Sequence, residues 1–193
     1  AQSQNVILVN GKSFTSNRNA AVGRITHFRT SDAVDVVAGE AGDAYPALNR
    51  WARRIVFIKP NVFLIHDVLD AKEPATFQFL LHAPDEFALS SPDRGSFKAP
   101  HGQVDFQFLH PVGLRITQTD AYEPPPAKWS DLHLSEWHLT ASTTKKTRGQ
   151  HFLTMFHVNG RKAMTDWIRI ENGFQISLES EGSDTTYRVK LDD

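Results

Sequence analysis

One ten-residue stretch gathers basic and aromatic side chains in a nearly neutral chain. The segment 45–54 holds three arginines and two aromatic residues, Tyr45 and Trp51. Guanidinium groups bind carboxylates and sulfates through paired hydrogen bonds, and Tyr or Trp rings stack on sugar faces. The pattern predicts that Tyr45, Arg50 and Arg53 contact an acidic sugar. The alternative is a strand entry whose arginines are only solvated.

The nine histidines are the other side chains that could do chemistry, because imidazole is a common metal ligand. Two ligands on one face of a strand require His-x-His spacing, and the sequence contains no such pair. His133 and His138 would face opposite sides of a strand, whereas His151 and His157 would share a face about 20 Å apart. We therefore expect surface or hydrogen-bonded histidines and no bound metal.

Motifs for nucleophilic catalysis are missing from the sequence. It has no cysteine, no Gly-x-Ser-x-Gly elbow and no phosphate-binding loop. Asp67 and Asp70 follow an apolar run, where Asp commonly caps a turn. We expect no catalytic residue in this chain.

Short strands must position these side chains, because the dominant pattern is alternation of apolar and polar residues between turn signals. The clearest hairpin joins residues 54–58 to 62–66 through a Lys-Pro-Asn turn, and Asn10-Gly11 is another turn signal. About 14 such runs predict an all-β, two-sheet antiparallel β-sandwich. We expect residues 1–193 to form one domain. The predicted core of the central hairpin is Trp51, Ile55, Phe57, Phe63 and Ile65.

The composition is that of an ordinary globular domain, with 40% hydrophobic and 22% charged residues. Because 21 basic residues balance 22 acidic ones, no global field favours nucleic acid or an anionic membrane as a partner. No apolar run reaches the length of a membrane span, and no signal peptide opens the chain. The chain begins without Met, so we expect it to be part of a longer protein.

Two segments resemble heparinase II/III-like polysaccharide lyases. Residues 5–12, Asn-Val-Ile-Leu-Val-Asn-Gly-Lys, are similar to that family's Ala-His-Asn-Thr-Val-Leu-Val-Asp-Gly stretch. Downstream, residues 42–45 and 53–67 follow the family's order of a Tyr, an Arg-led apolar strand, a short turn and a second apolar strand closed by Asp. The recognisable likeness covers about residues 1–90.

The resemblance implies a C-terminal β-sandwich module that accompanies an N-terminal helical toroid, absent from this chain. Such lyases are bacterial, periplasmic or secreted enzymes that cleave acidic polysaccharide by β-elimination at a uronic acid. Their Tyr and His acid–base groups come mainly from the toroid and from a His-x-His strand early in the sandwich, so the resemblance implies that this chain alone is inactive. The polysaccharide itself is left open.

The family's zinc ion is held partly by the His of the Ala-His-Asn stretch. Gln4 stands at that position, and the other two family ligands precede this chain, so we expect no zinc at this place. Two alternatives stay open: a non-catalytic carbohydrate-binding or structural β-sandwich, and a complete enzyme with an unrecognised site.

Overall fold

The computed structural model describes residues 4–14, 22–122, 136–159, 164–171, 173–179 and 186–192. In these ranges the backbone forms fifteen strands and one short 3-10 helix, η1 (Gly42–Ala44). The strands are β1 (Ile7–Val9), β2 (Arg24–Arg29), β3 (Val34–Glu40), β4 (Leu48–Ile58), β5 (Val62–Ala75), β6 (Phe77–Ala83), β7 (Ala88–Ser91), β8 (Arg94–Ala99), β9 (Gly102–His110), β10 (Arg115–Thr119), β11 (Trp137–Ser142), β12 (Thr147–Val158), β13 (Met164–Ile170), β14 (Gly173–Glu179) and β15 (Thr186–Asp192).

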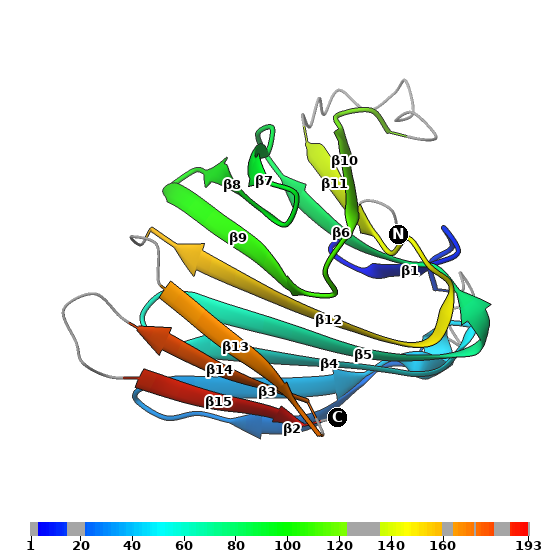
Figure 1. The fold of residues 1–193 in the computed structure, drawn as a ribbon, viewed down its shortest axis with the longest axis horizontal. Coiled ribbons are helices and arrows are strands. Elements are labelled where there is room, and N and C mark those ends of the chain that lie inside the picture. The colour runs from blue at the N-terminus through cyan, green and yellow to red at the C-terminus, as the bar shows by residue number, and fades with distance from the viewer. Residues whose placement is uncertain are drawn as a thin grey trace.

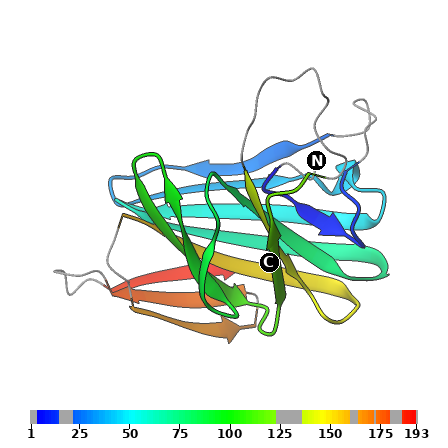
Figure 2. The ribbon, with the colours of Figure 1, turned by 90° about the horizontal axis from the view of Figure 1, so that it is seen from above.

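These strands form three antiparallel sheets. The large sheet has the order β2-β3-β4-β5-β12-β9-β8-β7, and a four-stranded sheet has the order β1-β6-β11-β10. A third sheet, β13-β14-β15, lies on the opposite side of the large sheet (Figures 1 and 2). The predicted all-β antiparallel sandwich is confirmed, and the third sheet adds a layer that the sequence analysis did not predict.

Alternation along the strands produces the main core between the large and the four-stranded sheets. Phe79 of β6 packs against Phe108 and Phe152 of the large sheet, with ring centroids 5.5 and 5.9 Å apart. All three rings are almost fully buried. Burial of this many large apolar side chains is the dominant favourable contribution to such a fold.

A second core lies between the large sheet and the third sheet. Val56, Leu64 and Leu153 of the large sheet pack there with Phe174 and Ile176 of β14. The central strands are therefore covered on both faces, which is why their sequences are almost continuously apolar.

Both turns that the sequence predicts, Asn10-Gly11 and the turn between β4 and β5, are present. Asn10 and Gly11 both have positive φ, at 52° and 75°, as the tight turns that join paired strands require. The hairpin of β4 and β5 is also confirmed, with Ile58 opposite Val62 beside its turn.

The predicted core of this hairpin is only partly correct. Trp51 is buried, but Ile55, Phe57, Phe63 and Ile65 are only half-buried. Phe57 and Phe63 stack on each other with ring centroids 4.2 Å apart. From Trp51 onward in β4, and in β5, odd-numbered positions lie on the side of the four-stranded sheet, whereas even-numbered positions such as Val56 and Leu64 pack against the third sheet and are buried. Near the turn, the predicted core residues thus lie on the less buried of the two faces.

Among the described residues, the structure contains no helix with the length and apolar character of a membrane span.

The two faces of the hairpin should differ in their response to truncation. Leu64 is fully buried, so Leu64→Ala should lower the free energy of unfolding by about 2–5 kcal/mol. Phe57→Ala should cost less than about 2 kcal/mol, below the 3–5 kcal/mol typical of a buried Phe. Urea titration of both variants measures the difference, and a larger loss for Phe57→Ala would contradict the assignment of the faces.

Candidate functional site: the arginine segment and its groove

The arginine segment, residues 45–54, is anchored by the buried carboxylate of Asp67. Asp67 lies inside β5 opposite Arg53, not at a strand end as the sequence analysis expected, and its side chain is fully buried. Its Oδ1 accepts hydrogen bonds from Trp51 Nε1 at 2.8 Å and Arg53 Nε at 2.7 Å. Its Oδ2 accepts one from Arg53 Nη2 at 3.0 Å. The paired geometry makes this a charge-assisted, two-pronged contact.

Arg53 also ties the N-terminal segment to this carboxylate. Its Nη1 donates to the backbone oxygen of Asn5 at 3.0 Å, and its guanidinium lies 5.3 Å from the centre of the Trp51 ring. With one side on Asp67 and another on Asn5, Arg53 is chiefly a structural residue whose outer edge lines a groove.

Tyr45 is also integrated into the core. Only 2% of it is exposed, and its hydroxyl donates to the Ile7 backbone oxygen at 2.8 Å. Its ring packs edge-on against Trp51, with centroids 5.0 Å apart. Burial raises the pKa of Tyr45 to about 12. The ring offers almost no surface to a ligand in this arrangement. Tyr45 instead stabilises the arginine segment by packing against Trp51 and bonding to Ile7.

Arg50 is the member of the predicted set that lies at the surface. Its side chain is 43% exposed, and its Nε is 3.8 Å from Glu40 Oε1. Glu40 Oε2 accepts a hydrogen bond from Arg24 Nη2 at 3.0 Å, so two arginines share one carboxylate. Gly42 allows η1 to pack closely against the backbone of β4, because a Cβ there would lie 2.9 Å from the Cα of Arg50.

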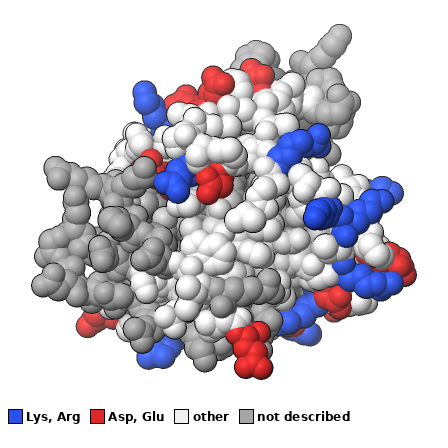
Figure 3. All heavy atoms as spheres, in the orientation of Figure 1, with Lys and Arg blue, Asp and Glu red and all other residues white. Residues whose placement is uncertain are grey.

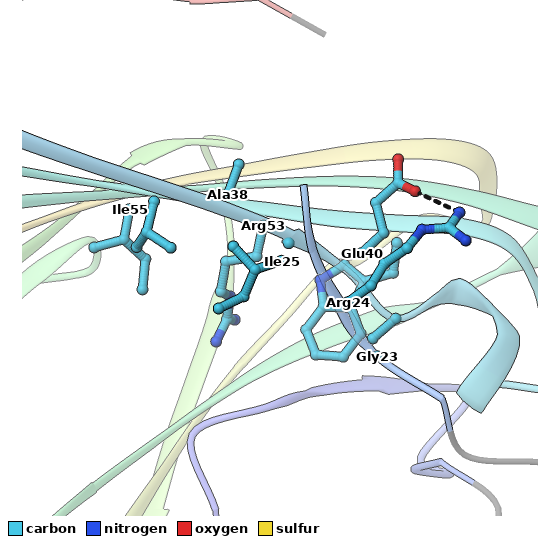
Figure 4. A pocket seen from close by; sticks show the side chains of 11 residues that line it. Gly23, Arg24, Ile25, Ala38, Glu40, Arg53 and Ile55 are labelled. Atoms are coloured by element: carbon cyan, nitrogen blue, oxygen red, sulfur yellow. Dashed lines mark hydrogen bonds and ion pairs between the residues drawn. The ribbon is translucent and has the colours of Figure 1, made fainter. Parts of the chain in front are cut away.

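A groove of about 340 Å³ runs along β2, β3 and β4 beside these arginines (Figure 4). Small and apolar residues form most of its wall, and Arg24, Arg53 and Glu40 carry its charges. The lining residues are Gly23, Arg24, Ile25, Val37, Ala38, Gly39, Glu40, Ala41, Trp51, Arg53 and Ile55. A second hollow of about 60 Å³ shares Arg24, Glu40 and Trp51 and extends the groove to Arg50.

The outer strand beside the groove exposes large apolar side chains. Ile25 and Phe28 of β2 are 74% and 70% exposed, and Val22 just before the strand is 57% exposed. Grouped apolar exposure on a soluble protein commonly marks a binding or domain-contact surface. The sequence does not reveal this feature, because short alternating runs are typical of strands with one face covered, whereas all six residues of β2 are exposed.

Acidic and basic side chains are interspersed on the face shown in Figure 3, without a broad patch of one sign. In the groove, Arg24 and Arg50 share Glu40 and Arg53 binds Asp67. Electrostatic attraction for an acidic ligand would therefore be local and short-range.

The structure pairs histidines that the spacing analysis separated. His82 and His138 are opposite each other on β6 and β11, with ring centroids 4.8 Å apart. His66 Nε2 lies 3.1 Å from His151 Nδ1 across β5 and β12. Both pairs depend on strand register, which spacing along one strand does not reveal. His133 lies outside the described residues, and Gln4 is exposed.

No protein-family model and no curated protein matches this sequence. Several solved structures share its fold. The heparan sulfate lyase HepC from Pedobacter heparinus superposes with a TM-score of 0.75 at 12% identity, covering 100% of this chain and 31% of that one. The heparinase III BT4657 gene product superposes with a TM-score of 0.71 at 14% identity, covering 98% and 30%.

The chain thus spans about 30% of the length of these lyases. At this identity the likeness establishes the fold. The resemblance seen in residues 1–90 of the sequence is confirmed for the fold, and the shared fold extends over the whole chain.

The Asp67 anchor predicts a sharp contrast between two carboxylates of β5. Asp67→Ala leaves Arg53 and the Trp51 N–H without their buried acceptor, so unfolding should become easier by about 3–5 kcal/mol. Asp70→Ala, in which an exposed carboxylate loses one hydrogen bond from Asn49, should cost no more than about 1 kcal/mol. Equal midpoints for the two variants in urea would contradict the anchor.

Tyr45 predicts a loss of stability at alkaline pH. Its pKa of about 12 in the fold exceeds the ordinary value of 10.0, so its contribution is complete below pH 10 and disappears as the pH rises toward 12. The stability of the wild type should therefore fall more steeply above pH 10 than that of Tyr45→Phe. Thermal melting of both proteins across this range tests the prediction, and parallel curves would refute it.

Proposed function

We propose that this chain is the β-sandwich module of a heparinase II/III-like polysaccharide lyase. The observation that carries the proposal is the superposition of the entire chain on about a third of a heparan sulfate lyase. The intact protein would cleave uronic-acid-containing polysaccharide by β-elimination, with a helical toroid domain as the partner of this module. A periplasmic or secreted location belongs to the same proposal.

The role proposed for this module is to form one wall of the polysaccharide cleft. The groove combines an apolar wall with the exposed guanidinium groups of Arg24 and Arg50. Apolar walls suit the carbon faces of sugar rings, and guanidinium groups suit uronate carboxylates and sulfates. The exposed apolar residues of β2 would continue this wall or contact the partner domain.

The module alone would not catalyse the reaction. β-Elimination needs a base near the proton beside the carboxylate and groups that stabilise the resulting anion. Tyr45 is buried, hydrogen-bonded and raised in pKa, so it is not placed to remove a proton from a ligand. The base and the acid would come from elsewhere in the intact protein.

A non-catalytic sandwich that binds carbohydrate or serves only as a scaffold is the second candidate. It is favoured by the pairing of the groove arginines with Glu40 and Asp67. If the chain binds an oligosaccharide, it is not only a scaffold. If it also forms unsaturated product, it is a complete enzyme and not a module that needs a partner domain.

The first expected outcome concerns activity and binding by the isolated chain. Incubated with heparan sulfate, it should produce no unsaturated uronate absorbance. It should bind a uronate oligosaccharide weakly, and moderate salt should weaken the binding further, because each exposed contact contributes about 1 kcal/mol or less.

Arg24→Ala combined with Arg50→Ala should remove most of this binding in calorimetric titration. Arg53 is left intact because its removal would leave the buried Asp67 carboxylate without its cationic partner. Arg115→Ala, an exposed arginine of β10 in the four-stranded sheet, is the matched control. Sustained turnover by the purified chain, or equal binding by the double variant and the control, would contradict the proposal.

A further inference from the structure

A second group of polar residues lies on the outer face of the four-stranded sheet. Phe79 and Leu81 of β6 and Leu139 of β11 point into the main core, so His82 and His138, one position away on these strands, point outward. Glu136 immediately precedes β11. Antiparallel register thus places the imidazole of His82 beside His138 and Glu136, which are close to each other but distant from His82 in sequence.

The ligand atoms of these three residues are close enough to share one ion. One nitrogen of each histidine and one carboxylate oxygen of Glu136 lie within 4.8 Å of one another. His138 Nε2 is 3.8 Å from Glu136 Oε2. Ligands of a four-coordinate zinc ion with bonds of about 2.1 Å are about 3.4 Å apart. Small side-chain rotations would therefore complete the geometry.

Asn5 orients the first imidazole. Its Oδ1 accepts the backbone N–H of His82 at 2.8 Å, which identifies this atom as the oxygen, and it lies 3.0 Å from His82 Nδ1. Nδ1 must then carry the proton, and Nε2 has the lone pair with which imidazole binds metals. A metal-binding histidine usually has such a partner on its other nitrogen.

The second imidazole has a buried nitrogen without a hydrogen-bond partner in the part of the chain that the structure describes. Among the described residues, no group forms a hydrogen bond with His138 Nε2, although that atom is buried. A buried polar atom without a partner is costly and calls for an explanation such as an ion.

Tyr122 holds the carboxylate in place. Its hydroxyl donates to Glu136 Oε2 at 2.9 Å, and its ring packs edge-on against His138, with centroids 4.5 Å apart. The three candidate ligands are thus each contacted by a further residue that restricts their orientation.

We propose that His82, His138 and Glu136 bind a divalent transition-metal ion, with Zn²⁺ as the preferred occupant. Two imidazoles and one carboxylate form a borderline set that suits zinc and leaves a fourth position for water or an external ligand. The site is independent of the proposed function and does not involve Gln4. The earlier expectation of a metal-free chain considered histidine pairs within one strand, and this site arises between strands.

The test is a calorimetric titration of the full, chelator-treated chain with Zn²⁺. The wild type should bind one ion per chain. His138→Gln should weaken binding by more than about 100-fold, beyond the 10–100-fold typical of residues that only orient a ligand. His27→Gln, an exposed histidine of β2, is the matched control and should bind as the wild type does. Substituted Co²⁺ should give the intense visible absorption of a four-coordinate ion.

Circular dichroism checks that each variant is folded. Should His138→Gln fail to fold, Glu136→Gln decides, because it removes the carboxylate charge just outside β11 and should also weaken Zn²⁺ binding. The absence of saturable binding by the wild type would overturn the proposal. So would unchanged affinity in folded His138→Gln or Glu136→Gln.

Discussion

The Asp67 carboxylate adds a buried, directional link between β4, β5 and the start of the chain to the backbone ladder that pairs the two strands. It is fully buried and accepts three hydrogen bonds from Trp51 and Arg53, and Arg53 extends the network to Asn5. A buried charge is tolerable only when its partners are present, so β4, β5 and the start of the chain must come together in one register. Trp51 and Arg53, which line the groove, are held in place by these hydrogen bonds.

The position of the groove follows from how far the four-stranded sheet extends over the large sheet. The four-stranded sheet covers the large sheet over the main core, but β2 remains outside this cover, and its six residues are all exposed. Its apolar side chains border the hollow that Arg24 and Arg50 flank. Hydrogen-bonded side chains beside an exposed apolar edge suit a surface contacted by a sugar chain or by another domain.

The strands and their turns could be predicted from the sequence because alternation and turn residues are local signals. The hairpin of β4 and β5 and the Asn10-Gly11 turn are examples. What depends on register could not be predicted: Asp67 was placed at a strand end, Phe57 was assigned to the core, and the pairing of His82 with His138 was not seen. The roles of Tyr45 and Arg53 depend in the same way on Ile7 and Asp67, which are distant in sequence.

The central claim is that the groove on β2–β4 receives an acidic polysaccharide. The most direct measurement is a nuclear magnetic resonance titration of the labelled chain with a short heparan sulfate oligosaccharide. The account predicts shifts concentrated at the amides of Arg24, Gly39 and Glu40 and at the indole N–H of Trp51. Shifts confined to other strands, such as β8 and β9, or no shifts at high ligand concentration, would contradict it.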